Sequence, residues 1–191
     1  MDNSTANATC LYESGKSKGL TNVWMTVFTP SYQRAKTLKR TYESLLGLQL
    51  PRDKNGNEVK FEWLIVDDGS TDGTDSLVRR WCGEDRLPIR YYYQENQGKH
   101  VATNLAVDIC RSEMFLILDS DDTLLPWAME VFYHEWQRID DKEAFKGVSG
   151  RCLNPDTNCV IGSGFPPPSG PDKIRYYIDA DTRDMRFKYH I

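Results

Sequence analysis

Three carboxylates lie within four residues at Asp119-Ser120-Asp121-Asp122, directly after an apolar run. Carboxylates this close repel one another unless they are solvated, protonated or bound to a cation. Alternate residues of an extended chain point the same way, so Asp119 and Asp121 would face one ligand while Asp122 reaches it from a turn. Oxygen ligands suit Mg²⁺ or Mn²⁺, which share their remaining positions with water and phosphate. The cluster predicts a metal site beside a leaving diphosphate, with a solvated turn or helix cap as the alternative.

A second acidic pair, Asp67 and Asp68, also follows an apolar run and precedes the stretch 69–74, GSTDGT. Glycine, serine, threonine and aspartate in this order are typical of tight turns and of residues that cap a following helix. A carboxylate at a strand end is also able to accept hydrogen bonds from a base N–H or from ribose hydroxyls. The spacing leaves both interpretations open, a structural turn and a nucleotide contact.

An alternation of strand-like and helix-like segments must position these polar clusters. Apolar, β-branched or aromatic runs predict strands, and apolar residues at helical spacing after each run predict a helix. Four such units predict an α/β fold with a mainly parallel sheet flanked by helices, whose ligands bind beyond the carboxyl ends of the strands. One crevice would then collect the loops that follow the strands. The expected strands span 23–29, 61–66, 89–93 and 114–118, and the expected helices lie within 38–46, 77–81, 102–109 and 127–139.

The composition bounds the class of protein. The chain has 191 residues, 39% of them hydrophobic and 27% charged, which fits one globular domain. Residues 1–21 are polar and predict a flexible leader, so the domain is expected over 22–191. A net charge of −4 without a basic stripe gives no indication of nucleic-acid binding. Five scattered cysteines without a CxxC pair predict reduced thiols rather than a zinc site or a disulfide framework.

Targeting signals are also absent from the sequence. The chain has no run of 18 apolar residues and no signal-peptide pattern at its N-terminus. We therefore expect a cytoplasmic location. No feature indicates contact with a membrane surface, although such contact is left open.

Four short motifs, taken in order, resemble the motif series of family-2 glycosyltransferases. The resemblance covers about residues 22–150 and implies a GT-A, Rossmann-like fold. It also implies an inverting transferase of the hexosyltransferase class that uses Mn²⁺ or Mg²⁺. Such an enzyme moves a sugar from a nucleoside diphosphate sugar, usually a UDP-sugar, to a hydroxyl of a saccharide or other acceptor in polysaccharide or glycoconjugate biosynthesis. The motifs are Thr29-Pro30-Ser31-Tyr32, the stretch 66–74, Asn96-Gln97-Gly98-Lys99 with Asn104, and Leu118-Asp119-Ser120-Asp121-Asp122.

The resemblance also implies roles for single residues. Thr29 and Tyr32 would line the nucleotide pocket, and Lys99 would lie near the diphosphate or the base. Asp67 or Asp68 would contact the base, and Asp119 would face the ribose or the sugar. Asp121 would be the chief metal ligand, with Asp122 assisting through the metal or its water. The full set expected to bind the donor is Thr29, Pro30, Tyr32, Arg34, Asp67, Asp68, Gly69, Asn96, Gly98, Lys99, Asn104, Asp119 and Ser120.

Inversion also requires a general base that takes the proton of the acceptor hydroxyl. The resemblance places an Asp or Glu in this role well beyond the metal motif, and no clear match stands here. The remaining acids, Asp179, Asp181 and Asp184, lie in a polar stretch, and the chain ends on the strand-like residues 187–191. We therefore expect the base beyond Ile191 and the C-terminal part of the domain to be missing. A further strand is expected over 147–153, and a connecting loop over 162–170.

Two other classes of function compete with a glycosyltransferase. A nucleotidyltransferase is expected to carry a glycine-rich phosphate loop with a basic residue after its first strand, and this chain has Thr29-Pro30-Ser31-Tyr32 there. A non-catalytic nucleotide-sugar-binding module is harder to distinguish from a glycosyltransferase, because no residue is assigned as the catalytic general base. The sequence names neither the donor sugar nor the acceptor.

Overall fold

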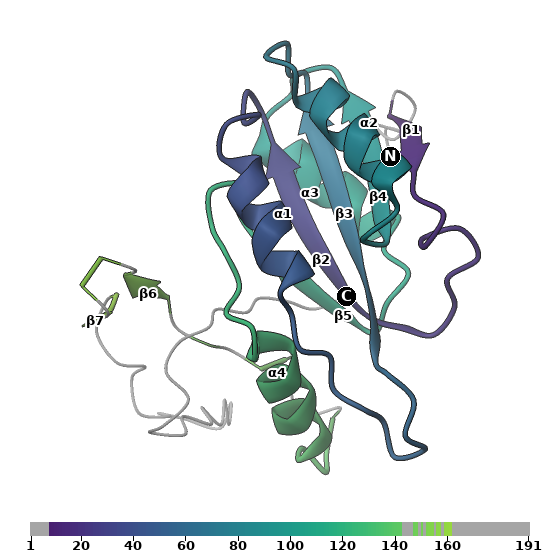
Figure 1. Cartoon of the computed structure of the whole chain (residues 1–191), viewed down its shortest axis with the longest axis vertical. Helices are drawn as coiled ribbons and strands as arrows, with labels where there is room; N and C mark the ends of the chain where they lie inside the picture. Colours follow the sequence, from purple (N-terminus) through teal and green to yellow (C-terminus); the bar gives the residue numbers. More distant parts are fainter. Residues whose placement is uncertain are drawn as a thin grey trace.

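The computed structural model describes residues 8–142 and, beyond them, residues 147–148, 150, 152–154, 156–157 and 159–161. Strands and helices alternate through most of this part of the chain (Figure 1). The elements are β1 (Thr9–Glu13), β2 (Val23–Ser31), α1 (Leu38–Leu46), β3 (Lys60–Asp68), α2 (Thr74–Glu84), β4 (Ile89–Gln94), α3 (Lys99–Asp108), β5 (Met114–Ile117), α4 (Ala128–Gln137), β6 (Leu153–Asn154) and β7 (Cys159–Val160).

The main sheet has five strands in the order β1-β4-β3-β2-β5. Neighbouring strands from β4 to β5 are parallel, and only β1 runs antiparallel, at the edge beside β4. The chain builds outward from β2 through β3 to β4 and then returns to place β5 on the other side of β2. In open parallel sheets such a reversal marks the point where ligands bind, outside the carboxyl ends of the strands. The predicted α/β fold with a mainly parallel sheet is confirmed.

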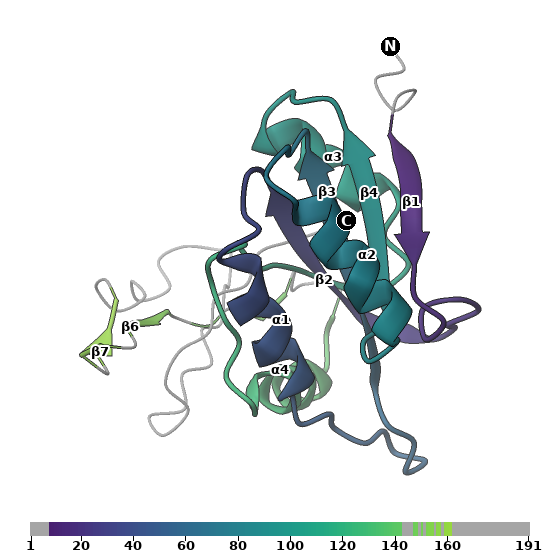
Figure 2. The ribbon, with the colours of Figure 1, turned by 45° about the horizontal axis from the view of Figure 1, so that its top comes forward.

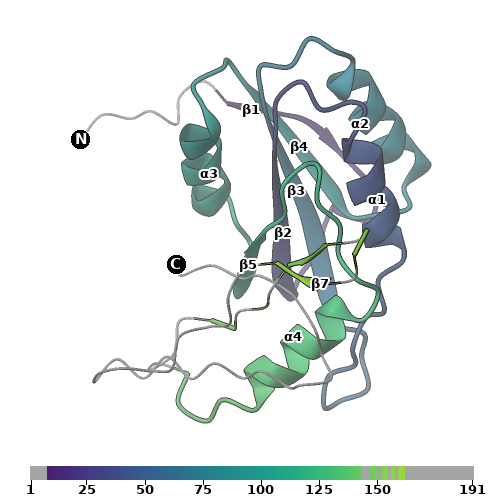
Figure 3. The ribbon, with the colours of Figure 1, turned by 90° about the vertical axis from the view of Figure 1, so that its left-hand side faces the viewer.

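Helices cover both faces of the sheet. Figure 3 shows α1 and α2 on one face and α3 on the other. Residues alternate along β2, so Met25 and Val27 pack in the cluster with α1 and α2, while Phe28 packs in the cluster with α3. Every residue of β2 is buried, as expected for a strand covered on both faces. The rings of Tyr42 on α1 and Trp81 on α2 stack 4.3 Å apart and join the two helices above β3.

The flexible leader expected over residues 1–21 differs from the structure in its second half. Thr9–Glu13 forms strand β1, which lies along β4 at the sheet edge (Figure 2). Tyr12 stacks on Tyr91, and the buried hydroxyl of Ser14 donates to the carbonyl of Leu87 at 2.8 Å. The segment is ordered because its polar side chains satisfy backbone groups and one tyrosine supplies the apolar contact, a combination that composition does not reveal. Residues 1–7 lie outside the described residues.

Beyond residue 142 the structure describes too few residues to test all the elements that the sequence predicts there. Of the strand expected over 147–153, the described residues 147, 148, 150 and 152 lie outside any strand, and β6 covers only Leu153–Asn154. The loop expected over 162–170 and the remaining acids Asp179, Asp181 and Asp184 lie outside the described residues. Among the helices that the structure describes, none has the length and apolar character needed to cross a membrane.

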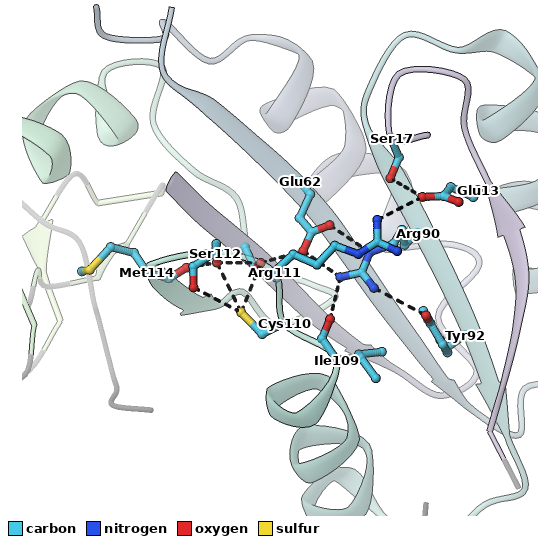
Figure 4. Close-up of polar contacts among 11 residues, drawn as sticks. Glu13, Ser17, Glu62, Arg90, Tyr92, Ile109, Cys110, Arg111, Ser112 and Met114 are labelled. Carbon is cyan, nitrogen blue, oxygen red and sulfur yellow. Dashed lines mark hydrogen bonds and ion pairs between the residues drawn. The ribbon is translucent and has the colours of Figure 1, made fainter. Parts of the chain in front are cut away.

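A buried ion pair fixes the end of the sheet opposite the predicted crevice (Figure 4). Arg90 on β4 donates through Nε and Nη2 to the two carboxylate oxygens of Glu62 on β3, at 2.8 and 2.7 Å. Both side chains are 1% exposed. Arg90 Nη2 also donates to the carbonyl of Ile109 at 2.9 Å, where α3 ends. Burial lowers the pKa of Arg90, but the hydrogen bonds and charge of Glu62 outweigh it and raise this pKa above its ordinary value.

Candidate functional site

The loops that follow the first two parallel strands, β2 and β3, are tied together by Gln33. Its backbone N–H donates to Ser70 Oγ at 2.8 Å, and its side-chain amide donates to Thr71 Oγ1 at 3.0 Å and accepts the Thr71 N–H at 3.2 Å. Gln33 holds a left-handed backbone conformation with φ of 55°, which is unfavourable for a residue with a side chain. These bonds close the β2–α1 loop against the turn that precedes α2.

Asp72 makes a second connection between the same two loops. One carboxylate oxygen accepts the Ala35 N–H at 2.9 Å, and the other accepts the Thr74 N–H at 3.1 Å and its hydroxyl at 2.6 Å. Thr74 is the first residue of α2, so this bond satisfies an amide that the helix itself leaves unpaired. Burial raises the pKa of Asp72, but the hydrogen bonds from Thr74 and Ala35 outweigh it and hold the pKa below its usual value.

Replacement of Asp72 by alanine is expected to lower the free energy of unfolding by about 1 kcal/mol, the usual effect of removing such a carboxylate at a helix start. Because the folded-state pKa is lowered, the stabilisation is present above the unfolded pKa of about 3.9 and is lost as pH falls through the folded value. Urea titrations of Asp72→Ala and wild type at pH 7 and pH 3 measure this difference, with Ser76→Ala on exposed α2 surface as control. A difference that grows toward pH 3 would contradict the assignment.

Asp68 connects the loop after β3 to the loop after β4. It is 5% exposed, and its carboxylate accepts the N–H groups of Gln97 and Gly98, each at 2.8 Å, and the Gln94 side-chain amide at 2.7 Å. Gly69 follows with φ of 87°, and a Cβ there would lie 2.9 Å from the Asn96 nitrogen. Asp68 therefore holds the backbone just before and at the start of α3 through hydrogen bonds. Gly69 is required because the two loops approach too closely for a side chain at this position.

Asp67 is fully buried and has partners inside the fold. Its carboxylate accepts the Tyr91 hydroxyl at 2.5 Å and the Ser70 N–H at 2.8 Å. Burial is the main cause of the raised pKa of Tyr91, and its hydrogen bond to Asp67 adds to it. The structure thus shows the turn-forming role that the sequence left open for this pair, and a direct contact of either carboxylate with a base stays a prediction.

The acidic motif lies beside Lys99, which the resemblance places near the diphosphate or the base. Lys99, the first residue of α3, donates to Asp119 at 2.6 Å across the gap between the β4 and β5 loops. Its side chain is 58% exposed and that of Asp119 is 44% exposed, so both are accessible from solvent. This contact joins residues that the sequence places in separate motifs, at the reversal point between β2 and β5.

The extended geometry expected for the acidic motif is wrong. Strand β5 ends at Ile117, and the Asp122 N–H donates to the Asp119 carbonyl at 2.9 Å, which closes a turn. Alternation along a strand therefore does not apply, and within this turn Ser120 is buried while Asp121 and Asp122 are exposed. The Thr41 hydroxyl of α1 donates to the Asp122 carbonyl at 2.9 Å and fixes the turn against the helix.

The acidic turn contains the residues that the resemblance assigns to the metal. Within the part of the chain that the structure describes, no group of at least three His, Cys, Asp or Glu side chains is arranged to hold a metal ion. Exposed carboxylates in a fixed turn are nevertheless the oxygen donors that Mg²⁺ and Mn²⁺ prefer, and such ions take several ligands from water and substrate phosphate. The exposed carboxylates of this turn therefore have the donor chemistry that suits a divalent cation.

The other predicted donor-site residues differ in how accessible they are from solvent. Thr29 and Pro30 are buried in β2, where the Thr29 hydroxyl accepts the Trp63 indole N–H at 2.9 Å and serves the core. Gly98 caps α3 with φ of 96°. The accessible residues, all in loops at the carboxyl edge or on α3, are Tyr32, Arg34, Asn96, Lys99 and Asn104.

Three residues that the sequence did not single out matter for this arrangement. Gln33 and Asp72 tie the loops, and Thr41 holds the acidic turn. Asp72 lies in the stretch 69–74, whose residue types predict capping of the following helix, so its bond to the start of α2 was predictable from the sequence. The other two act on partners 37 or more positions away and carry no local signal.

A parallel sheet with this reversal point, bordered by loops that carry a lysine and an acidic turn, is typical of α/β proteins that bind ligands beyond the carboxyl ends of their strands. Residues 26–156 match the family model described as Glycosyl transferase family 2. The chain belongs to this family, and the resemblance in its motifs is confirmed.

Individual relatives agree with the family. The chain is 33% identical over 142 residues to a chondroitin synthase of Escherichia coli, an alignment that covers 74% of this chain and 19% of that protein. It is 34% identical over 98 residues to TuaG of Bacillus subtilis, described as a putative teichuronic acid biosynthesis glycosyltransferase, over 51% of this chain and 36% of that one. The chain therefore spans about a fifth to a third of the length of these relatives.

Solved structures confirm the GT-A fold. The mannosyltransferase PcManGT of Pyrobaculum calidifontis, in complex with GDP-Man and Mn²⁺, matches with a TM-score of 0.56 and 26% identity, over 76% of this chain and 39% of that chain. Residues 1–349 of Staphylococcus aureus TarS, in complex with UDP-GlcNAc, match with a TM-score of 0.52 and 24% identity, over 76% of this chain and 37% of that one.

Proposed function

We propose that this chain is the donor-binding part of an inverting glycosyltransferase that uses a nucleoside diphosphate sugar, with UDP as the expected nucleotide, and a divalent cation. The contact between Lys99 and Asp119 carries the proposal, because it brings a cation and the acidic turn together at the edge where a diphosphate would bind. The solved complexes with UDP-GlcNAc and with GDP-Man and Mn²⁺ support a nucleotide sugar and a metal. The polysaccharide synthases among the relatives support a saccharide acceptor.

In this proposal, different residues bind different parts of the donor. Tyr32 is 49% exposed and offers a ring face on which a base packs. Lys99 leaves Asp119 and pairs with the diphosphate, while Asp121 and Asp122 hold the cation. A divalent cation held there would supply positive charge against the charge that develops on the leaving diphosphate. Deprotonation of the acceptor needs a general base, which we do not assign among the described residues.

Incubation of the protein with UDP-GlcNAc or GDP-Man in Mn²⁺, followed by chromatography of the released nucleoside diphosphate, tests the transferase class. The expected result is metal-dependent release from one donor, to water or to an added saccharide. Because no general base is assigned among the described residues, binding of the donor without release is compatible with a donor-binding part, whereas failure of both donors to bind would contradict the proposal. Release of pyrophosphate from a nucleoside triphosphate and a sugar phosphate would instead support a nucleotidyltransferase.

Replacing Lys99 with methionine is expected to weaken binding of UDP in Mn²⁺ by about 10- to 100-fold, because a hydrogen bond to a charged group contributes about 1.5–3 kcal/mol. The stability of the free protein should change by less than about 1 kcal/mol, since the Lys99–Asp119 pair is exposed. Fluorescence titration and urea unfolding measure the two quantities. Lys60→Met is the control, because Lys60 is the first residue of β3 and lies at the end of the strand opposite the candidate site. An unchanged affinity of Lys99→Met for UDP would contradict a role of Lys99 in binding the donor.

A further inference from the structure

The acidic turn, residues 119–122, is anchored to the fold on both sides. Before the turn, the Leu118 N–H donates to the Phe28 carbonyl of β2 at 2.8 Å. At its end, the Asp122 carbonyl accepts the hydroxyl of Thr41 on α1 at 2.9 Å. The first anchor joins two backbone groups, whereas the second depends on a side chain. A single substitution on α1 is therefore able to release one side of the turn.

The Thr41 hydroxyl bonds outside its own helix. A threonine or serine hydroxyl within a helix often donates to a carbonyl three or four residues earlier. Ser44 does so, because its hydroxyl donates to the Thr41 carbonyl at 2.8 Å. Thr41 is fully buried, yet its own hydroxyl donates to the acidic turn. Other residues of α1 supply its apolar packing, namely Leu38, Tyr42 and Leu45, so the Thr41 hydroxyl serves the turn rather than the helix.

The chain that follows the turn is also fastened to α1, and it runs alongside this helix to α4 (Figure 2). The Leu124 N–H donates to Ser44 Oγ at 3.2 Å. The Gln49 N–H, just beyond α1, donates to the Pro126 carbonyl at 2.8 Å. Of these three connections to α1, the one from Thr41 reaches the turn itself, and the other two hold the chain beyond it.

Both backbone polar groups of Asp122 are bonded in the free protein. Its N–H donates to the Asp119 carbonyl within the turn, and its carbonyl accepts the Thr41 hydroxyl. The backbone that carries the exposed carboxylates is therefore fixed before a ligand arrives. A cation binds more tightly to ligands that are already placed, because less conformational entropy is lost on binding. Removing a hydrogen bond that orients metal ligands typically lowers metal affinity by about 10- to 100-fold.

We propose that Thr41 is a positioning residue for the divalent cation, and that its hydroxyl holds the acidic turn in the conformation in which Asp121 and Asp122 bind the metal. The proposal rests on the proposed function, because it concerns the cation of the same donor site. The buried Thr41 side chain acts through the position of the turn and touches neither the metal nor the nucleotide. Loss of the hydroxyl therefore lowers the gain in affinity that Mn²⁺ gives and leaves the metal-free affinity for the nucleotide unchanged.

Thr41→Val and Thr41→Ser test the proposal in calorimetric titrations with UDP and with GDP, each in Mn²⁺ and in EDTA. Valine keeps the branched shape of the side chain without the hydroxyl, whereas serine keeps the hydroxyl. In Thr41→Val, the ratio of the affinity in Mn²⁺ to that in EDTA is expected to fall by about 10-fold or more, with the affinity in EDTA unchanged. Thr41→Ser should keep the ratio of the wild type.

Ser14→Ala is the matched control for a general loss of stability. Ser14 is also fully buried, and its hydroxyl donates to the Leu87 carbonyl at 2.8 Å beside the start of β4, at the end of the sheet opposite the candidate site. Thermal unfolding should show a Tm lowered by about 2–4 °C in both Ser14→Ala and Thr41→Val, because each loses one buried hydrogen bond. The ratio of affinities should fall in Thr41→Val and stay unchanged in Ser14→Ala.

The proposal is overturned if Thr41→Val keeps the ratio of the wild type. Equal losses in Mn²⁺ and in EDTA would also overturn it, because they would place the effect on the nucleotide or on the whole fold. A ratio that falls in Ser14→Ala or in Thr41→Ser as far as in Thr41→Val would show that the hydroxyl of Thr41 is not the cause. In all these cases the wild-type protein still gains affinity from Mn²⁺, whereas a wild-type protein that gains none removes the metal site of the proposed function as well.

Discussion

Replacement of Asp121 by alanine is expected to weaken binding of nucleoside diphosphate in Mn²⁺ by at least about 100-fold, down to the level that wild type shows in EDTA. Asp121 is exposed in a turn that the backbone N–H of Asp122 closes, so truncating the Asp121 side chain leaves this bond between described residues in place. A cation that bridges protein and diphosphate contributes several kcal/mol, and each 1.4 kcal/mol is a tenfold change in affinity.

Equilibrium dialysis with labelled UDP and GDP, in Mn²⁺ and in EDTA, measures this effect. Asp108→Ala is a control that removes the same charge from the exposed last residue of α3. It should bind as wild type does. An Asp121→Ala variant that keeps the full Mn²⁺ dependence would show that the cation is held elsewhere, and the role given to the acidic turn would then be wrong.

The second large effect is expected at the buried pair of Glu62 and Arg90. Replacing Glu62 with methionine leaves the guanidinium of Arg90 buried without its counter-charge, which typically lowers the free energy of unfolding by about 3–5 kcal/mol. Thr26 would also lose an acceptor, because its hydroxyl donates to Glu62 at 2.7 Å. Single domains are stable by only about 5–15 kcal/mol, so a substantial part of the protein is expected to unfold at moderate urea concentration.

The double variant Glu62→Met with Arg90→Met separates the charge from the packing. Removing both charges should recover most of the lost stability, because well-packed apolar residues often replace a buried ion pair without loss. Glu43→Met breaks the exposed pair with Lys39 and should change stability by less than about 1 kcal/mol. A double variant as unstable as the single one would show that the loss comes from packing rather than from the unpaired charge.

Much of the fold was predictable because the parallel strands are covered on both faces. Such strands are continuous apolar runs, and the runs expected over 23–29, 61–66, 89–93 and 114–118 coincide with β2, β3, β4 and β5 to within two residues at each end. The edge strand β1 escaped prediction for the opposite reason. Its order comes from pairing with β4 and from serine hydroxyls that satisfy backbone groups, so its composition resembles that of a loop.

The candidate site was predictable in its location but not in its connections. The loops at the carboxyl ends of parallel strands gather at one end of the sheet, so the sequence alone predicts that the acidic motif and Lys99 lie near each other. The bonds of Gln33 to the β3 loop and of Asp68 to the β4 loop join residues about 30 or more positions apart. Local spacing carries no information about such pairs. It also gave the wrong backbone geometry for Asp119 and Asp121, which lie in a turn rather than in the expected extended segment.

The central claim is that the carboxyl edge of this sheet binds a nucleoside diphosphate with a divalent cation. Calorimetric titration of the wild-type protein with UDP and with GDP, each in Mn²⁺ and in EDTA, tests it most directly. We expect saturable binding of at least one of them, strengthened by Mn²⁺. Absence of binding for both nucleotides in both conditions would contradict it and leave only the fold established.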